Sequence, residues 1–345
     1  MTRRALCLAV ALCLVAAVHA IAAAPEGPRL ALVEFGSKPG RLVLNSVDPS
    51  GGQALRLAGG GKKARPLPLL LDGPSWSGDG SSIAFTGIGG KVEGTSAFAV
   101  EGTQMYVVGA DGTGLRPVPG TTEGQGPVLS PDGRTIAFTR IRERRRTTRR
   151  GVEEVVYRSW SVWTAGIDGD GSTRLTPWRN GLLMSATSFS PDGSTLAVSR
   201  VTHEGAAPEI LAMRLDGGGS VVVARRASNG VYSPDGSKLA FLRAGRKGSP
   251  DLFTMNADGS EFHRLTRTPK GIELWPSWDP SGRRLVVTRV NGESEAGLFF
   301  GLGNAVIEMN ADGSCPTTIL KNRDTAFYGA TWQPGPGREA GPIAC

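Results

Sequence analysis

Histidine and cysteine, which often bind metals, are scarce in this sequence, which has 3 histidines and 4 cysteines among 345 residues. It contains no Cys-x-x-Cys pair, and only His203 and His263 lie beyond residue 24, so we predict no metal site and no bound cofactor. Beyond residue 24 no apolar run is long enough to cross a bilayer, and we predict no transmembrane segment in the mature chain. These shortages argue against metalloenzymes and helical membrane proteins.

Glycine, by contrast, is abundant: it accounts for 49 of the 345 residues, about twice the ordinary share. The glycines gather in turn dipeptides such as Asp-Gly and follow no Gly-X-Y period, which excludes collagen. With 39% hydrophobic residues the chain can also bury a sizeable core. The composition therefore predicts a folded protein made of many short strands joined by tight turns.

The first 24 residues have the order of a secretory signal peptide. Arg3 and Arg4 precede an apolar run over 5–17, and small residues follow over 20–24. We predict that residues 1–24 are removed on export, and that 25–345 form a single domain, a monomer that is secreted or periplasmic, within the cell envelope. The alternative is an uncleaved membrane anchor, for which the apolar run is short.

Cysteine usage agrees with export. Cys7 and Cys13 leave with the signal peptide, so that Cys315 and Cys345 remain in the mature chain. In an oxidising compartment such a pair is expected to be bridged, and we predict a disulfide between these two residues. The alternative is a pair of free thiols.

One phrase recurs along the chain, a four-residue turn followed by a short apolar strand. It reads Ser-Pro-Asp-Gly at 130–133, 190–193 and 233–236, with looser copies at 77–80 and 279–282. Proline presets φ at the first corner and glycine takes the left-handed position, so each copy predicts a hairpin turn. A second hairpin signal, Asp-Gly, follows each copy, and several copies then end in Leu-Thr, as at 175–176 and 265–266.

Four short strands in each unit of 43 to 60 residues, without a helical period, are typical of a propeller blade. The turn phrase occurs five times, and a sixth unit that begins at Thr331 and Trp332 is completed by apolar runs over 30–57. We predict an all-β, six-bladed β-propeller with four antiparallel strands per blade, closed where the C-terminal strand joins the N-terminal blade. The predicted blades are 30–57 with 330–334, 74–119, 126–176, 186–226, 229–266 and 275–320.

The paired phrases, with copies such as Met-Asn-Ala-Asp-Gly at 255–259, resemble the WD40-like (PD40) repeat of the TolB-like six-bladed propellers. The resemblance covers nearly all of the chain after the signal sequence. It implies an exported propeller that serves as a binding platform, without naming a partner. TolB itself carries an α/β domain before its propeller, for which we expect no room here, so its envelope roles are not carried over.

No motif predicts a catalytic residue. The segment 292–296 lacks the final glycine of a Gly-x-Ser-x-Gly elbow. Asp-Gly-Asp-Gly at 168–171 begins like a calcium loop but lacks the distant glutamate and occupies a hairpin position. We therefore predict a non-catalytic protein; the alternative is a propeller-type hydrolase or lyase that acts on an extracellular polysaccharide. Four tryptophans near the predicted innermost strands are expected in the core: Trp76, Trp275, Trp278 and Trp332.

Loop lengths predict which face binds the partner. The turns after the first and third strand of each blade are short, whereas several connections after the second and fourth strands are long, at 59–73, 87–104, 142–158, 201–208 and 291–304. Long loops on a rigid scaffold are where recognition usually lies. We predict that this long-loop face binds a protein or an envelope or extracellular polymer.

The segment 142–150 contains six arginines in nine residues, and Val152, Val155 and Tyr157 beyond it predict an extended hairpin. One interpretation is a solvated hairpin that Glu153 and Glu154 partly neutralise. The other is a binding element for an anionic polymer or an acidic protein patch. Few aromatic residues accompany the arginines, so we expect no nucleic-acid partner. The candidate anion- and partner-binding residues are Arg142, Arg144, Arg145, Arg146, Arg149 and Arg150.

Overall fold

The protein's structure, a computed structural model, describes the parts of the chain that form its sheets and turns. The described residues are 27, 29–36, 42–50, 54–59, 67–68, 73–88, 102–149, 151, 153–169, 171–203, 205–244, 250–268, 271–291, 303–321, 325–335 and 341–345. The predicted signal peptide lies outside these residues, as do most of the predicted long loops at 59–73, 87–104 and 291–304.

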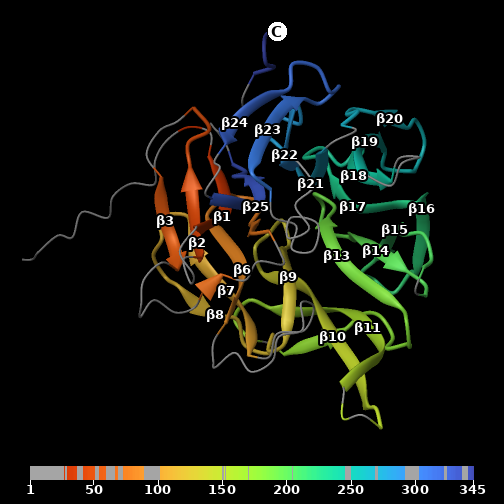
Figure 1. Ribbon diagram of the computed structural model, residues 1–345. Helices are drawn as coiled ribbons and strands as arrows, with labels where there is room; N and C mark the ends of the chain where they lie inside the picture. Colours follow the sequence, from red (N-terminus) through yellow and green to blue (C-terminus); the bar gives the residue numbers. More distant parts are fainter. Residues whose placement is uncertain are drawn as a thin grey trace, which may run out of the picture.

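All regular secondary structure in these described ranges is β-strand, and it forms six antiparallel sheets around a common centre (Figure 1). We number the sheets as blades, each given from its innermost strand outward. Blade 1 comprises β25 (Thr325–Trp332), β1 (Leu30–Gly36), β2 (Leu42–Val47) and β3 (Leu55–Gly59); blade 2 comprises β5 (Ser75–Trp76), β6 (Ser82–Ile88), β7 (Thr103–Gly109) and β8 (Arg116–Pro117); blade 3 comprises β9 (Gly124–Leu129), β10 (Thr135–Thr147), β11 (Glu153–Gly166) and β12 (Ser172–Arg174).

The remaining blades repeat the same order. Blade 4 comprises β13 (Leu183–Phe189), β14 (Thr195–Val201), β15 (Glu209–Arg214) and β16 (Ser220–Arg225); blade 5 comprises β17 (Ala227–Tyr232), β18 (Lys238–Ala244), β19 (Pro250–Asn256) and β20 (His263–Arg264); blade 6 comprises β21 (Gly271–Trp278), β22 (Arg284–Asn291), β23 (Ala305–Asn310) and β24 (Thr317–Lys321). The predicted six-bladed propeller is confirmed.

The ring closes as the sequence predicted. β25 pairs antiparallel with β1, from Leu30 opposite Trp332 to Gly36 opposite Thr325. Blade 2 departs from the four-strand expectation, because an additional strand, β4 (Leu67–Pro68), also pairs with β6. β5 pairs with one half of β6 and β4 with the other, so two short strands share the place of one innermost strand.

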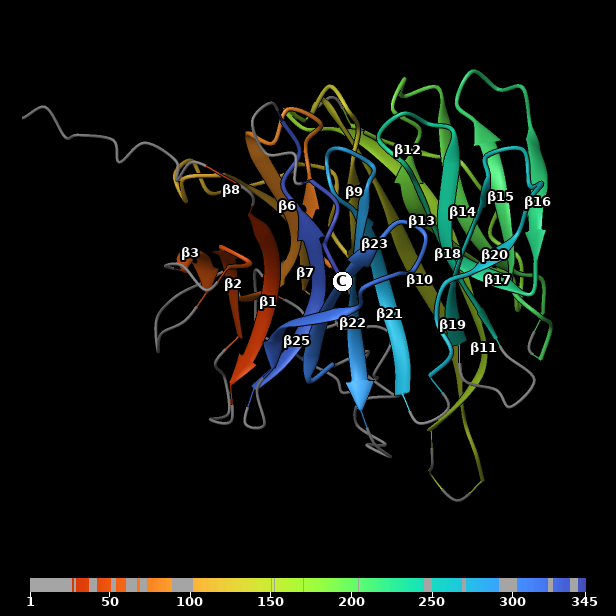
Figure 2. The ribbon, with the colours of Figure 1, turned by 90° about the horizontal axis from the view of Figure 1, so that it is seen from above.

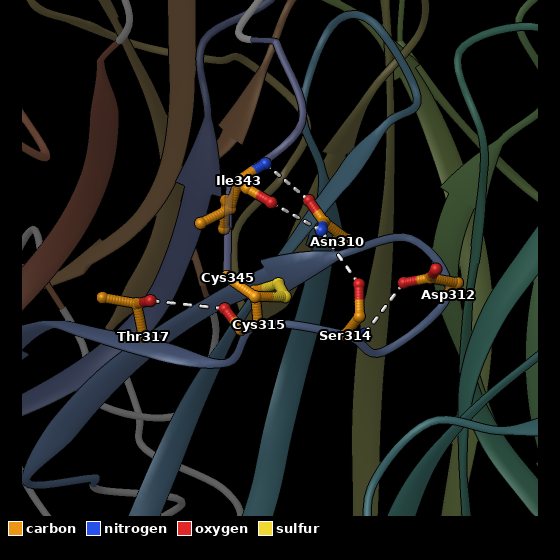
Figure 3. Close-up of a disulfide and its surroundings, with 7 residues drawn as sticks. All are labelled: Asn310, Asp312, Ser314, Cys315, Thr317, Ile343 and Cys345. Atoms are coloured by element: carbon orange, nitrogen blue, oxygen red, sulfur yellow. Dashed lines mark hydrogen bonds between the residues drawn. A yellow bond between two sulfur atoms is a disulfide. The ribbon is translucent and has the colours of Figure 1, made fainter.

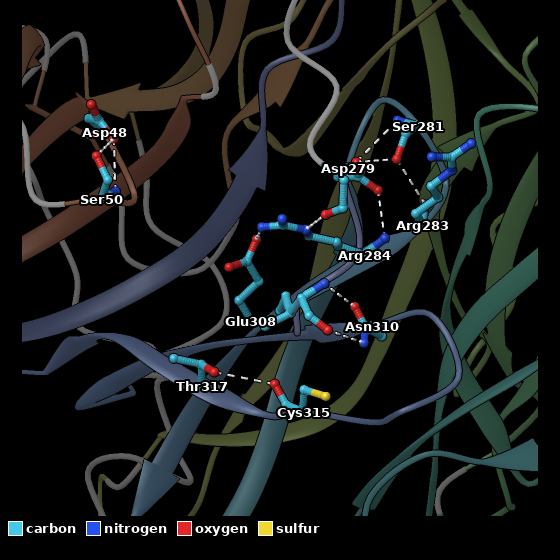
Figure 4. A network of polar contacts seen from close by, with 12 residues as sticks. Asp48, Ser50, Asp279, Ser281, Arg283, Arg284, Glu308, Asn310, Cys315 and Thr317 are labelled. Atoms are coloured by element: carbon cyan, nitrogen blue, oxygen red, sulfur yellow. Dashed lines mark hydrogen bonds and ion pairs between the residues drawn. The ribbon is translucent and has the colours of Figure 1, made fainter. Parts of the chain in front are cut away.

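Each Ser-Pro-Asp-Gly turn is held by its own side chains. In blade 3 the Ser130 hydroxyl donates to Asp132 (2.6 Å) and accepts the N–H of Thr135 (2.9 Å), while Gly133 adopts a φ of 68°. The same serine bonds recur in blades 2, 4 and 5. In blade 6, Asp279 replaces the serine and accepts the N–H of Arg284 at 2.7 Å (Figure 4).

The copy at 77–80 lacks the proline for a physical reason. The N–H of Gly78 donates to the carbonyl of Pro131 in the next blade (3.1 Å), which a proline could not do. A Cβ on Gly78 would also lie 2.4 Å from that carbonyl oxygen. The irregular turn is therefore a contact between blades.

The threonine of the Leu-Thr phrase follows the outermost strand, and its hydroxyl hydrogen-bonds to the main chain of the neighbouring strand. The hydroxyl of Thr266 accepts the N–H of Leu252 on β19 (2.9 Å), and that of Thr176 accepts the N–H of Val162 on β11 (2.8 Å). Thr121 makes the same bond to Met105 in blade 2 (3.1 Å).

The core consists of six clusters, one between each pair of neighbouring blades. The second strand of a blade serves two clusters because alternate side chains face opposite sides of the sheet. In β10, Ile136 and Phe138 pack toward blade 2, whereas Ala137 packs toward blade 4. Because both sides of the second strand are buried, the sequence after each turn is a continuous apolar run. The small residue within the run, such as Ala137, allows the neighbouring blades to pack closely.

Candidate functional site

The longest strands of the protein form a hairpin on the predicted long-loop face. β10 has 13 residues and β11 has 14, and they pair from Thr135 opposite Gly166 to Thr147 opposite Glu153. The innermost strand β9 accompanies β10 only as far as Arg140. The remainder is a two-stranded wing, which projects beyond the other strands at the lower edge of Figure 2. We call residues 142–149 and 153–158 the arginine hairpin.

A buried carboxylate joins the two strands of the arginine hairpin. The side chain of Glu143 is only 5% exposed and forms ion pairs with Arg158 on the opposite strand (2.7 Å) and with Arg145 (3.1 Å). The sequence interpretation assigned neutralisation to Glu153 and Glu154 and overlooked Glu143, because only the strand register shows that Glu143 faces Arg158. Arg145 is therefore part of the hairpin's own structure.

Two further arginines are partly engaged. The guanidinium of Arg142 lies 4.2 Å from the ring centre of Trp178, a cation–π contact that holds it against the blade. Arg146 and Glu154 approach to 3.7 Å, but both side chains are exposed. An exposed pair of this kind contributes little free energy.

Arg144 and Arg149 have the greatest freedom to meet a partner. Both are exposed, and within the described part of the chain neither has an ion-pair partner. Arg150 lies outside the described residues. Among the five described arginines of the candidate set, Arg142, Arg145 and Arg146 thus have partners within the protein, whereas Arg144 and Arg149 have no ion-pair partner in the described part of the chain.

A central cavity of about 760 Å³ lies between the innermost strands. Five turn prolines line it, with Gly78 in the sixth place; they are Pro131, Pro191, Pro234, Pro280 and Pro334. The described lining residues include no Asp, Glu, Lys, Arg or His. Burial raises the pKa of the lining Tyr232, which keeps its phenol uncharged. The cavity wall is therefore neutral in a chain whose net charge is +8.

The predicted core tryptophans do not all share one environment. Trp76, Trp278 and Trp332 are buried, as predicted, but Trp275 is only half-buried and lines the cavity. Its ring centre lies 5.1 Å from that of Tyr328.

Trp275 also has an unusual backbone conformation. β21 bulges away from β22 between Leu274 and Ser277, and Trp275 in this bulge has a φ of 57°. For a bulky residue the left-handed conformation costs about 1–2 kcal/mol. The corresponding bulge residues in other innermost strands are Gly126, Asn229 and Gly329, which tolerate it better.

The predicted disulfide is present between Cys315 and Cys345, with a Cα–Cα distance of 5.1 Å (Figure 3). Hydrogen bonds hold the same C-terminal segment, because Asn310 accepts the N–H of Ile343 (2.7 Å) and donates to its carbonyl (3.0 Å). The guanidinium of Arg284 also donates to the carbonyl of Gly341. These contacts fasten the segment to blade 6, and a disulfide is consistent with an oxidising compartment.

No group of three or more His, Cys, Asp or Glu side chains in the described part of the chain is placed to hold a metal ion. Nor does the same part contain a helix of the length and apolarity needed to cross a membrane.

The fold is a six-bladed β-propeller with a neutral central cavity and a basic wing. No protein-family model matches the chain. The Tol-Pal system protein TolB of Anaeromyxobacter dehalogenans (strain 2CP-C) is 34% identical over 122 residues, which are 35% of this chain and 27% of that relative. The similarity thus spans about a quarter of the relative's length.

Solved structures extend the similarity over the ring. TolB from Acinetobacter baumannii superposes with a TM-score of 0.66 at 19% identity, covering 89% of this chain and 67% of that one. An oligogalacturonate lyase in complex with manganese superposes with a TM-score of 0.51 at 16% identity, covering 75% and 70%. These superpositions show the fold. The fold is the six-bladed β-propeller that TolB also has, and the sequence match to TolB covers about a third of the chain.

Proposed function

We propose that the protein is an exported, non-catalytic binding platform that recognises the acidic surface of a partner protein through its long-loop face. The observation that carries this proposal is the arginine hairpin, which projects from the ring and presents Arg144 and Arg149 without ion-pair partners among the described residues. A basic element on a rigid scaffold attracts acidic partners and adds bidentate hydrogen bonds to carboxylates. The relative in a named protein system supports a protein partner.

Export to the periplasm or the exterior is part of the same proposal. It is supported by the signal-like order of residues 1–24 and by the disulfide between Cys315 and Cys345. An anionic envelope or extracellular polymer is the second partner class, because it offers the same negative charge.

A pair of matched double variants tests the proposal. Arg144→Ser with Arg149→Ser removes the free hairpin arginines, and Arg134→Ser with Arg283→Ser removes two exposed arginines from turns on the opposite face. The measurement is the capture of proteins from an envelope extract, across a salt series, by wild type and both variants. We expect the hairpin variant to lose at least tenfold in retention, and wild-type retention to fall steeply with salt.

The replacement of Arg144 and Arg149 by Lys refines the test, because it keeps the charge and removes bidentate geometry. We expect intermediate retention for that variant. Equal capture by the hairpin and opposite-face variants would refute the proposal. Capture that disappears after protease treatment of the extract would identify a protein partner, whereas capture that survives it would identify a polymer.

The alternative function is a hydrolase or lyase for an extracellular polysaccharide. The superposition with an oligogalacturonate lyase favours it at the level of the fold. We place it second because the described residues that line the cavity offer no carboxylate or histidine for proton transfer. Turnover of a glycan that survives purification and is abolished by one cavity substitution would favour this alternative.

A further inference from the structure

The neutrality of the central cavity restricts what it can hold. Charged residues make up 20% of the chain, yet none occurs among the described residues that line this cavity. A charged ligand would leave water for a wall without a counter-charge, which is unfavourable. The volume of about 760 Å³ lies within the ~300–1,000 Å³ that is usual for small-ligand sites. The cavity therefore suits an uncharged ligand of limited size.

Trp275 combines a strained backbone conformation with a position in the wall of the central cavity. Three other innermost strands place Gly or Asn at the same bulge, so the fold does not require an indole there. A strained residue at a cavity is an observation from which a ligand-binding role is inferred. The half-buried Trp275 and Trp160 both present ring surface to the cavity.

We propose that the central cavity binds an uncharged oligosaccharide. The C–H faces of sugar rings pack on aromatic rings such as Trp275 and Trp160, which are partly exposed and line the cavity, and sugar hydroxyls both accept and donate hydrogen bonds. They can therefore bond to the side chains of Asn229 and Ser185, which are partly exposed and also line the cavity. An uncharged peptide is the rival ligand, and it serves as a probe in the test.

The test uses titration calorimetry and tryptophan fluorescence on the mature protein. The uncharged probes are cellohexaose and N-acetylated chitohexaose, the acidic probe is hexagalacturonate, and the peptide probe is an uncharged Gly-Ser-Pro peptide. We expect at least one uncharged sugar to bind and to quench or shift the fluorescence, and hexagalacturonate to bind at least tenfold more weakly.

Trp275→Asn is the informative variant, because Asn229 shows that asparagine tolerates this bulge. We expect the variant to retain or raise the melting temperature and to lose at least tenfold in sugar affinity. Trp178→Phe, away from the cavity, should leave sugar affinity unchanged, as should the hairpin double variant. Failure of both uncharged sugars to bind, equal affinity of Trp275→Asn, or tighter binding of the peptide or of hexagalacturonate would overturn the proposal. None of these results would bear on capture by the arginine hairpin.

Discussion

The turns and loops that connect the strands are stabilised differently on the two faces of the ring. On the short-turn face, serine and aspartate side chains of each turn bond within the same turn, and the pattern recurs from blade to blade. On the long-loop face the arginine hairpin has no counterpart among the described residues, and Glu143 bonds arginines of both its strands. The repeated contacts hold the turns of several blades in the same way, whereas an element that occurs in a single blade can be specialised for recognition.

The largest stability effect is expected where the ring closes. Gly329 on β25 has a φ of 58°, and a Cβ there would lie 2.1 Å from the Cα of Gly73. Gly329→Ala adds this clash to the left-handed backbone, so we expect a loss of about 3 kcal/mol or more in the free energy of unfolding. Urea denaturation measures it.

Gly114→Ala is the matched control, because Gly114 has a φ of 66° and nothing within 4 Å of the added Cβ. It should lose only about 1 kcal/mol, from the backbone alone. Equal losses in the two variants would mean that the contact between Gly329 and Gly73 does not constrain the ring.

A smaller effect is expected from acid, and it should act through the short-turn face. Hydrogen bonds from the turn serines are the main cause that lowers the pKa of Asp79, Asp132, Asp192 and Asp235 below the usual value of 3.8. The unfolded chain therefore binds protons more readily than the folded chain as the pH falls. The stabilisation from these carboxylates is complete above the usual value and is lost as the pH falls through the folded pKa values.

Urea midpoints between pH 7 and pH 3 test this dependence. We expect a decline that begins below about pH 4 and that becomes shallower when all four aspartates are replaced by asparagine, which keeps an acceptor oxygen for the serine. An unchanged decline in the fourfold variant would assign the acid sensitivity to other carboxylates and contradict the prediction.

The short-turn face was also the part most accessible to prediction. Its turns depend on residues within a few positions of one another, so Ser130, Asp132 and Gly133 indicate their own conformation. The blade number and the closing strand follow from the count of those turns. Non-local features were not predictable: the additional strand β4 and the left-handed Trp275 depend on how distant segments meet. Glu143 was missed for the same reason, since its partner Arg158 is identified by strand register.

The smallest effect on global stability is expected at the arginine hairpin, which lies outside the six core clusters. Glu143→Gln removes the negative charge that joins Arg145 and Arg158. The carboxylate is buried but both arginines are substantially exposed, so we expect a local loss of about 1 kcal/mol. Hydrogen exchange over 142–147 and 153–158 should become faster while exchange in the blade cores stays the same.

Glu154→Gln is the control for this change, because its pair with Arg146 is long and exposed. It should leave hydrogen exchange in the hairpin nearly unaltered. If Glu143→Gln lowered the global urea midpoint as much as a core substitution does, the hairpin would belong to the cooperative unit of the ring, and the contrast between the two faces would fail. If exchange accelerates only in the hairpin, the wing is an appendage that unfolds independently, and charge changes in it can alter binding without a cost in folding.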